Sequence, residues 1–296
     1  MIGYGTHRSP CSAPEPREAL DEGAPRPRVL ITGGGRGLGK VCAERLAADG
    51  ASVFVTGRDE QMLIETVKGI RHDGGVAEFL GVDLTAAHSA ADLVTSVTEA
   101  FGGIDVLVNN AGNAGPHGPL WSVDEREWWR TLEVNLRGAC TLTSAVLPGM
   151  IAQGGGRVIT MVSRAGVTRW PFASAYAVSK AALVSMTANL EGELRGTGVK
   201  VFAFDPGKLE IGMTGTHFER GHTGNPWEDH IHDWLRETRD RGGFTPVDTA
   251  VRAFTNMVSG SSDHFAGRYV TTEDLVPGEV STGAFGAPGS PHGDHE

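Results

Sequence analysis

The feature that most constrains this chain is an alternation, between residues 28 and 275, of short apolar runs rich in β-branched residues with longer segments of helical periodicity. A parallel strand needs a crossover helix before the next strand, so this alternation predicts a doubly wound α/β sheet. The predicted strands are residues 28–32, 52–56, 77–82, 106–109, 158–162, 199–204 and 268–270. The predicted helices are residues 38–49, 59–72, 88–101, 124–151, 174–195 and 246–259. We therefore expect one layered α/β domain, built on a seven-stranded parallel sheet with helices on both faces.

The two ends of the chain differ from this pattern in composition. Residues 1–27 contain five prolines and no apolar periodicity, and residues 276–296 are rich in Gly, Pro and Ser. Both compositions are typical of disordered segments. We expect residues 28–275 to form a single domain between a disordered arm and a disordered tail.

Charge and cysteine usage narrow the class of partner. The 296-residue chain carries a net charge of −10, which disfavours nucleic acid or an anionic membrane surface and favours a small molecule. Its three cysteines lack metal-binding spacing, so they are interpreted as free thiols in a reducing compartment. No run approaches the length of a membrane span, and the N-terminus lacks an apolar signal segment. We expect a cytoplasmic protein.

The first predicted strand runs into the sequence TGGGRGLG, which opens the first predicted helix. Gly33, Gly37 and Gly39 would let the backbone approach a pyrophosphate closely, and the helix N-terminus would offer unpaired N–H groups to the phosphates. The alternative is an ordinary tight turn. Because the cluster lies between a strand and a helix of an α/β sheet, a dinucleotide site is favoured.

Tyr176 and Lys180 lie four residues apart within a predicted helix, so they project from the same face. A neighbouring ammonium favours the phenolate and would lower the pKa of tyrosine from its usual value of about 10. Ser163 follows the apolar run RVITMV, where the end of a strand could present its hydroxyl to the same place. The alternative is a surface Tyr and Lys on an ordinary helix.

The spacing Gly-x-x-x-Gly-x-Gly, the sequence NNAG at residues 109–112, and Ser163 followed by Tyr-x-x-x-Lys together resemble the short-chain dehydrogenase/reductase superfamily over residues 28–275. The resemblance implies hydride transfer between a nicotinamide and a carbinol or carbonyl carbon. It also implies that Tyr176 is the general acid or base, that Lys180 holds the ribose hydroxyls and lowers the Tyr176 pKa, and that Ser163 binds the substrate oxygen.

The same resemblance assigns further residues. Asn135 matches the helix asparagine that holds a water in the proton relay, or else is an ordinary polar residue. Asp83 would contact the adenine ring or else cap a turn or helix, and Asn109 would line the cofactor or else mainly stabilise the sheet. The expected cofactor contacts are Gly33, Gly35, Arg36, Gly37, Leu38, Gly39, Arg58, Asp83, Leu84, Asn109, Ala111, Gly112, Tyr176, Lys180, Pro206, Gly207 and Leu209.

One position departs from the family pattern. Where a threonine often contacts the nicotinamide carboxamide, this chain has Ile211. Either Thr214 substitutes from a shifted loop or the contact is absent. This departure concerns a contact with the nicotinamide carboxamide and does not involve the predicted catalytic residues.

The end of the second predicted strand bears on the choice of nicotinamide cofactor. Family members that prefer NAD usually carry an acid where this chain has Gly57, so that a carboxylate binds the ribose 2′-hydroxyl. Arg36 and Arg58 instead provide two guanidiniums that could clamp a 2′-phosphate. Asp59 is interpreted as the N-cap of the next helix. We therefore expect NADP(H) rather than NAD(H).

Residues 208–245 correspond to the segment that in this family usually closes over the substrate. Asn225 and Pro226 are helix-start signals, and an apolar stripe at helical spacing follows them, Trp227, Ile231, Trp234 and Leu235. A bulky, largely apolar carbonyl or alcohol substrate is expected, in contact with Trp170, Phe172, Trp227 and Trp234. The alternative is that these aromatic residues are simply core.

The same segment contains His217, His222, His230 and His232. His230 and His232 are two residues apart and would point in different directions on a helix, so no metal site is expected.

The resemblance also implies a homodimer or homotetramer, because helices such as 124–151 and 174–195 often pair between subunits in this family. The leading hypothesis is an NADP-dependent oxidoreductase that acts on a carbonyl or secondary alcohol. The alternatives are an NAD-dependent alcohol dehydrogenase of the same fold and a non-catalytic dinucleotide-binding sensor. The direction of hydride transfer is not decided by these residues, since the same groups work both ways.

Overall fold

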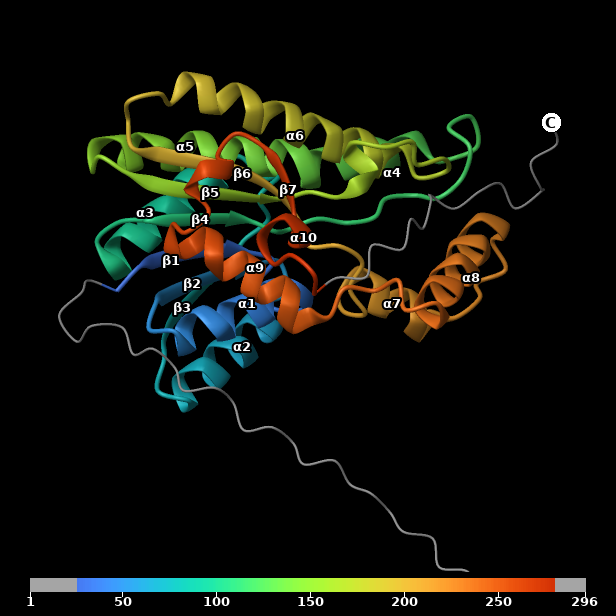
Figure 1. Ribbon diagram of the computed structural model, residues 1–296, viewed down its shortest axis with the longest axis horizontal. Coiled ribbons are helices and arrows are strands. Elements are labelled where there is room, and N and C mark those ends of the chain that lie inside the picture. The colour runs from blue at the N-terminus through green and yellow to red at the C-terminus, as the bar shows by residue number, and fades with distance from the viewer. Residues whose placement is uncertain (1–25, 280–296) are drawn as a thin grey trace, which may run out of the picture.

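One sheet of parallel strands forms the centre of the protein (Figure 1). The computed structural model describes residues 26–279. The strands are β1 (Arg28–Thr32), β2 (Ser52–Gly57), β3 (Val76–Gly81), β4 (Val106–Asn109), β5 (Gly156–Met161), β6 (Val199–Asp205) and β7 (Tyr269–Thr271), in the order β3-β2-β1-β4-β5-β6-β7. All seven predicted strands are confirmed, with small shifts at their ends. The order reverses between β1 and β4, and ligands bind such sheets at the carboxyl ends of the strands beside that reversal.

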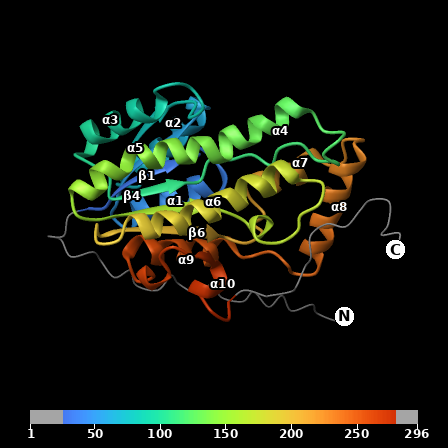
Figure 2. The ribbon, with the colours of Figure 1, turned by 90° about the horizontal axis from the view of Figure 1, so that it is seen from above.

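Helices cover both faces of this sheet (Figures 1 and 2). One face carries α1 (Gly37–Ala48), α2 (Glu60–His72) and α9 (Val247–Ser259). The other face carries α3 (Ser89–Phe101), α5 (Gly138–Ala152) and α6 (Ser174–Glu193), with α5 and α6 running side by side. The predicted doubly wound architecture is therefore confirmed.

The apolar core consists of two layers, one on each side of the sheet. Ile31 belongs to the layer under α1, α2 and α9, whereas its neighbour Leu30 belongs to the layer under α3 and α5. Successive side chains of a strand point to opposite faces, so a fully buried parallel strand must be apolar on both. This requirement explains why the strands of this chain are continuous β-branched runs rather than alternating ones.

The predicted helix 124–151 contains a π turn that its sequence did not indicate. The segment divides into α4 (Glu125–Leu132), the π turn at Glu133–Arg137 and α5. Within the π turn Asn135 is buried, and its side-chain amide bonds Asn113 and Ser179. An inserted residue of this kind is common at functional sites, because it changes the direction of a side chain without ending the helix.

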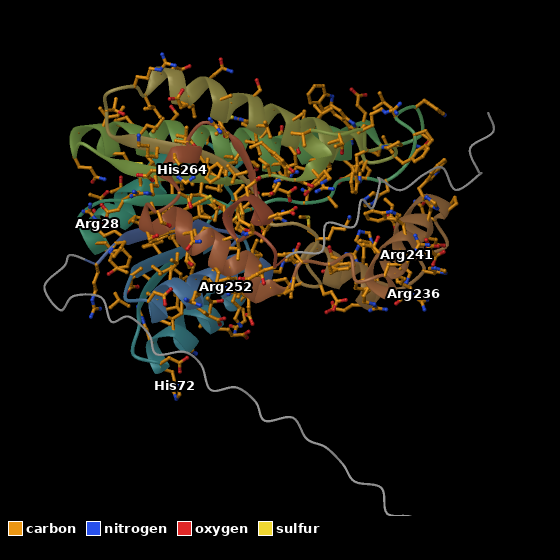
Figure 3. All side chains as sticks on the ribbon, in the orientation of Figure 1. Arg28, His72, Arg236, Arg241, Arg252 and His264 are labelled. Atoms are coloured by element: carbon orange, nitrogen blue, oxygen red, sulfur yellow. The ribbon has the colours of Figure 1, made fainter. Side chains whose placement is uncertain are left out.

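Two further helices lie at one end of the molecule, beyond the carboxyl ends of the strands (Figure 1). They are α7 (Met213–Arg220) and α8 (Pro226–Asp240). The predicted start of α8 is confirmed, because Asn225 accepts a hydrogen bond from the Trp227 N–H at 3.0 Å and Pro226 is the first helical residue. Arg236 and Arg241 lie on the outer part of α8, at the opposite end of the long axis from Arg28 (Figure 3).

The described residues extend slightly past both ends of the predicted domain, residues 28–275. Val276 packs against the core and Glu279 pairs with Arg252, so the ordered chain continues slightly past the predicted boundary at residue 275. The predictions for residues 1–25 and 280–296, Cys11 among them, lie outside the described residues.

Within residues 26–279 no helix is long and apolar enough to cross a membrane, and Cys42 and Cys140 are free thiols. A short helix, α10 (Thr272–Leu275), follows β7.

Candidate active site

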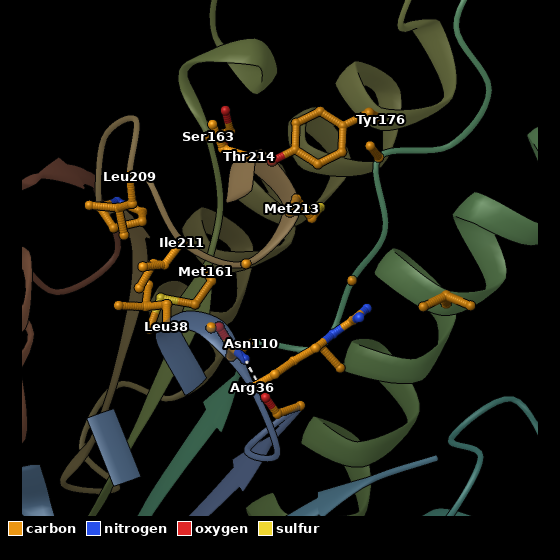
Figure 4. A pocket seen from close by; sticks show the side chains of 18 of the residues that line it. Arg36, Leu38, Asn110, Met161, Ser163, Tyr176, Leu209, Ile211, Met213 and Thr214 are labelled. Atoms are coloured by element: carbon orange, nitrogen blue, oxygen red, sulfur yellow. Dashed lines mark hydrogen bonds between the residues drawn. The ribbon is translucent and has the colours of Figure 1, made fainter. Parts of the chain in front are cut away.

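A pocket of about 550 Å³ opens at the carboxyl ends of the central strands. Its walls come from the glycine turn after β1, the loops after β2, β3, β4 and β6, the N-terminal part of α6, and the helices α7 and α8. Figure 4 shows Ser163, Tyr176 and Thr214 together in one part of this pocket, while Arg36 and Asn110 lie in another. The pocket is therefore elongated enough to bring the two predicted motifs into one site.

The glycine turn forms one wall. Gly33 and Gly37 have φ values of 68° and 54°, a backbone region that favours glycine. A Cβ atom on Gly37 would lie 2.8 Å from the Cα of Gly212, so the turn closely approaches the loop after β6. The predicted residues Gly35 and Leu38 also line the pocket.

Gly39 has a packing role instead of a lining one. It is buried, and a Cβ atom there would lie 2.4 Å from both the Asn110 Nδ2 and the Gly33 carbonyl oxygen. Glycine at this position therefore allows α1 to pack directly against the loop after β4. Gly39 is not among the residues that line the pocket, and its contact with the cofactor stays a prediction.

Two neighbouring asparagines lie at the end of β4, and only the second of them, Asn110, lines the pocket, whereas Asn109 was predicted to do so. Asn109 is buried and donates from Nδ2 to the Thr143 hydroxyl at 2.9 Å, so it stabilises the sheet, which was the alternative interpretation. Asn110 lines the pocket, and its Nδ2 donates to the Thr32 carbonyl at 2.8 Å. Odd and even residues of a strand end face opposite sides, which is why only one of the pair reaches the pocket. Ala111 and Gly112 line the pocket as predicted.

The predicted pair on α6 meets at the pocket. The Lys180 ammonium lies 5.6 Å from the centroid of the Tyr176 ring, and it donates to the Met161 carbonyl at the end of β5 at 2.7 Å. Lys180 is only 4% exposed. Ser163 lies two residues after the end of β5 and hydrogen-bonds Tyr176, so its side chain and those of Tyr176 and Lys180 on α6 converge on one spot.

Burial governs the acidities of this pair. It raises the pKa of Tyr176 to about 12, an effect that the Ser163 hydrogen bond opposes and the Asp205 carboxylate adds to. Burial lowers the pKa of Lys180 to about 8, against a raising effect of Asp205. The expected depression of the Tyr176 pKa is therefore not found, since loss of water around the phenolate outweighs the favourable neighbours.

Asn135 lies behind this pair and outside the pocket wall. It is 1% exposed; its Nδ2 donates to the Asn113 carbonyl at 2.9 Å and to the Ser179 hydroxyl at 3.0 Å. Ser179 precedes Lys180 on α6, so these bonds connect the π turn to the helix that carries the predicted catalytic pair. The resemblance implies that Asn135 holds a water of the proton relay. That water would have to reach Asn135 from this buried side.

The other part of the pocket is bordered by charged groups. Arg36 and Arg58 both line it and are exposed. Asp59 accepts from the Met62 N–H at 3.2 Å, which confirms its interpretation as the N-cap of α2. Gly57 also lines this region, and a Cβ atom there would lie 4.0 Å from the Cα of Gly33 in the glycine turn.

Asp83 lines the same region together with Leu84. Its carboxylate accepts from the Thr85 N–H at 2.9 Å and from the Arg130 guanidinium at 3.0 Å. The pKa of Asp83 is lowered, mainly by the hydrogen bonds from Thr85. Asp83 therefore serves as a turn residue, the alternative interpretation, while still bordering the pocket.

The four predicted substrate contacts separate into two pairs. Trp170 and Trp234 line the pocket, with ring centroids 5.4 Å apart in an edge-to-face arrangement. Phe172 and Trp227 stack on each other with centroids 4.4 Å apart and lie outside the pocket wall. Trp227 and Trp234 share a helix face, but seven residues of helix separate them by about 10 Å along the axis, which places only the second beside the pocket.

Three further pocket residues, Lys208, His117 and His217, were not predicted to line the site. Lys208 lies in the wall with its ammonium 5.0 Å from the centroid of the Trp234 ring. His117 and His217 face each other edge-on with centroids 5.5 Å apart. Burial, followed by the charge of His217, lowers the pKa of His117 to about 4, and burial lowers that of His217 as well. These residues come from three separate loops and helices, so spacing along the chain could not group them.

The loop between α7 and α8 brings together a cluster that the sequence analysis did not foresee. The ligand atoms of His222, His232 and Asp233 lie within 4.8 Å of one another. His222 Nε2 is 2.8 Å from the Asp233 carboxylate, and His232 Nδ1 is 3.1 Å from the His217 carbonyl oxygen. The contact between His222 and Asp233 connects the loop to α8, and it uses two of the side chains that a metal ion would need as ligands. The sequence analysis named His222 but argued only from the spacing of His230 and His232, and it did not consider Asp233.

Comparison with known proteins agrees with this geometry. A model of the short chain dehydrogenase family matches residues 27–221. A short chain dehydrogenase of Pseudocercospora fijiensis is 40% identical over 205 residues, which is 68% of this chain and 64% of the relative. The short-chain reductase protein NovJ of Streptomyces niveus is 39% identical over 197 residues, 65% of this chain and 72% of the relative.

A solved structure gives the same answer for the fold. A variant of actinorhodin polyketide ketoreductase with NADPH superposes with a TM-score of 0.76 at 28% identity, covering 85% of this chain and 98% of the ketoreductase. The fold and the pocket are those of a Rossmann-like oxidoreductase. The chain belongs to the short chain dehydrogenase family.

Proposed function

We propose that this protein is an NADP-dependent oxidoreductase that transfers a hydride between nicotinamide and the carbonyl or secondary alcohol carbon of a bulky, largely apolar substrate. The observation that carries the proposal is the convergence of Ser163, Tyr176 and Lys180 in a pocket that also contains the glycine turn. The apolar wall formed by Ile231, Trp234 and Leu235 supports a bulky substrate. Two relatives named as reductases support the carbonyl chemistry.

The residues around the glycine turn fit a dinucleotide. In the described chain no side chain caps the N-terminus of α1, and no acid lies in its first turn. The unpaired N–H groups of that turn therefore remain available to a pyrophosphate at the pocket wall. A bound nicotinamide cofactor would supply the hydride for reduction and accept it in oxidation.

The side chains of this protein would control the proton. In reduction, the Tyr176 hydroxyl gives its proton to the substrate oxygen as the carbon receives the hydride, which converts C=O to CH–OH and leaves a phenolate. Lys180 stabilises that phenolate and holds the ribose, while Ser163 donates to the substrate oxygen as negative charge develops. Asn135 completes the tetrad by supporting the relay that returns the proton. Oxidation reverses each step.

The preference for NADP rests on Arg36 and Arg58. Both line the pocket, Gly57 presents no carboxylate at the end of β2, and Asp59 accepts a hydrogen bond from the α2 backbone. A guanidinium provides several N–H donors that match phosphate oxygens, and a 2′-phosphate distinguishes NADP from NAD. The NADPH in the structure of the related ketoreductase supports the same choice.

We also propose a homodimer or homotetramer formed through α4, α5 and α6. Large apolar side chains are exposed on these helices, with Trp129 at 55% and Val178 at 45%. Exposed apolar residues gathered on neighbouring helices are a common feature of subunit contacts.

The first prediction concerns Tyr176→Phe, which removes one hydroxyl from a half-buried residue of the pocket wall. We expect kcat for NADPH-dependent reduction of cyclic or aromatic ketones to fall about 10²–10⁴-fold, because the proton donor is lost. Cofactor absorbance measures the rate, and the Kd for NADPH serves as the control, since it should change little. Full activity in the variant would refute the chemistry. A wild-type protein that binds NADPH but reduces no ketone in a broad panel would instead be a dinucleotide-binding sensor.

The second prediction concerns pH. Tyr176, with a pKa near 12, stays protonated across the neutral range, whereas Lys180, with a pKa near 8, does not. Below that value the ammonium is charged and stabilises the phenolate; above it this stabilisation is lost. We expect kcat/KM for reduction to be level below pH about 8 and to fall by up to about tenfold per pH unit above it. An increase above that pH would contradict this role of Lys180.

The third prediction concerns cofactor choice. Removal of both guanidiniums, in Arg36→Ala combined with Arg58→Ala, should weaken NADPH binding by at least about tenfold, because charge-assisted hydrogen bonds to phosphate are lost. NADH binding should be nearly unchanged. Arg45→Ala is the control, because Arg45 is exposed on α1 and pairs with Asp49. Equal or better turnover of the wild type with NADH would overturn the preference.

The fourth prediction concerns assembly. Light scattering should give a mass two or four times the 31.2 kDa of the chain. Val178→Glu should shift the mass toward the monomer, because it places a charge in an apolar contact. Val167→Glu is the matched control, with Val167 at 46% exposure in the loop before α6. A monomer mass for the wild type would refute the proposal.

A further inference from the structure

Two imidazoles and one carboxylate meet where the loop between α7 and α8 contacts α8. The loop contributes His222, and α8 contributes the consecutive residues His232 and Asp233. Their ligand atoms lie within 4.8 Å of one another, and the centroids of the two imidazole rings are 5.0 Å apart. These three residues do not line the pocket, so the proposed hydride transfer does not use them.

The imidazole of His232 is held in one tautomer. This residue is 7% exposed, and its Nδ1 lies 3.1 Å from the carbonyl oxygen of His217 on α7. A carbonyl can only accept a hydrogen bond, so Nδ1 carries the proton and Nε2 keeps its lone pair. Among the described residues no hydrogen bond engages that Nε2. Metal-bound histidines show the same arrangement, in which the second ring nitrogen donates to a carbonyl that fixes the ring.

His222 and Asp233 supply the other two donor groups at the surface. The Nε2 atom of His222 is 2.8 Å from the Asp233 carboxylate, and each side chain is 54% exposed. An imidazole nitrogen and a carboxylate oxygen are both metal ligands once they carry no proton. A cation could therefore take the place of the proton between them, and it could arrive directly from solvent.

The backbone on the C-terminal side of His222 is already fixed to α8. The N–H groups of Thr223 and Gly224 donate to the Asp229 carboxylate at 2.6 and 3.2 Å, and the Thr223 hydroxyl donates to Glu228 at 2.9 Å. Both acids lie in the first turn of α8. Because these bonds hold the loop in place, little further ordering is needed to bring the three donor groups around an ion.

We propose, against the expectation from the sequence, that His222, His232 and Asp233 bind a zinc ion. Two imidazole nitrogens and one carboxylate oxygen suit Zn²⁺, with a water molecule as the fourth ligand of a tetrahedral site. Mg²⁺ and Ca²⁺ instead prefer sites made of oxygen ligands. This inference concerns a site outside the pocket and does not rest on the proposed function.

The ion would strengthen the segment that closes one side of the pocket. Helix α8 supplies Ile231, Trp234 and Leu235 to the pocket wall, and α7 supplies His217, whose carbonyl receives the His232 hydrogen bond. A zinc ion on His232 would connect the loop to α8 and, through this bond, to α7. Its role is structural, because it stabilises the position of both helices.

The alternative is an ordinary surface pair of one histidine and one acid. His72 and Asp73 form such a pair on the other side of the molecule's sheet, with His72 Nδ1 3.0 Å from the carboxylate. Within the described chain this pair belongs to no group of three possible ligands. It therefore provides a matched control with the same residue types at nearly the same distance.

The experiment titrates the full-length, chelator-treated protein with Zn²⁺ in a calorimeter. The wild type should bind one ion per chain with a Kd of about 1 µM or lower. His222→Gln and Asp233→Asn each preserve a hydrogen bond between the two positions but remove a ligand, so they should weaken binding by at least about tenfold. His72→Asn should change the Kd less than about threefold. So should His292→Asn combined with His295→Asn, which removes the two histidines nearest the C-terminus.

Thermal unfolding and hydrogen exchange provide a second test. Zinc at about one hundred times its Kd should raise the Tm of the wild type by about 5 °C, and that of His222→Gln much less. It should also slow amide exchange in residues 221–225 of the wild type. Without zinc the two proteins should have similar Tm values, because the His222 side chain is exposed, and this shows that the variant folds.

Three results would overturn the inference. The first is wild-type binding no tighter than about 1 mM. The second is a Kd that neither His222→Gln nor Asp233→Asn changes. The third is loss of binding in a control variant, which would place the ion at His72 or near the C-terminus instead.

Discussion

The hydrogen bonds between Asn110 and the end of β1 are the interaction on which the site depends. The Asn110 and Ala111 N–H groups both donate to the Thr32 hydroxyl at 2.9 Å, and the Asn110 side chain bonds the Thr32 carbonyl. They connect β1 to the loop after β4 at the point where the strand order reverses. A crevice must open there, because the crossover helices after the two strands leave on opposite faces. These bonds fix its floor, and Gly39 lets α1 pack against it.

A second constraint is the burial of charge around the pair on α6. Lys180 is tied to the Met161 carbonyl, and its ammonium shares Asp205 with Lys208. Low exposure makes each of these charges sensitive to its neighbours, which is why the Tyr176 pKa is raised here rather than lowered.

The site could be predicted where local chemistry fixes the geometry. The glycine turn, the helical spacing of Tyr176 and Lys180, and the N-caps Asp59 and Asn225 each depend on a few neighbouring residues, and the structure places them as expected. Prediction was weaker where several segments meet. Phe172 and Trp227 stack on each other outside the pocket, and Asn109 faces the sheet, because distance along a helix and the alternation of a strand decide which neighbour reaches the cavity.

The sequence by itself determined the doubly wound sheet, its strands and the order of the motifs, since hydrophobic periodicity and glycine conformation act over short stretches of chain. The tertiary structure alone decided which charges share a neighbourhood. The elements β5, β6 and α8 meet at one end of the sheet. Only this arrangement brings Lys208 over Trp234 and into the neighbourhood of Arg164 and Asp205. The π turn at Asn135 and the contact of His222 with Asp233 could not be predicted from the sequence either. Electrostatic interaction depends on distance in space and on burial, and neither quantity can be read from spacing along the chain.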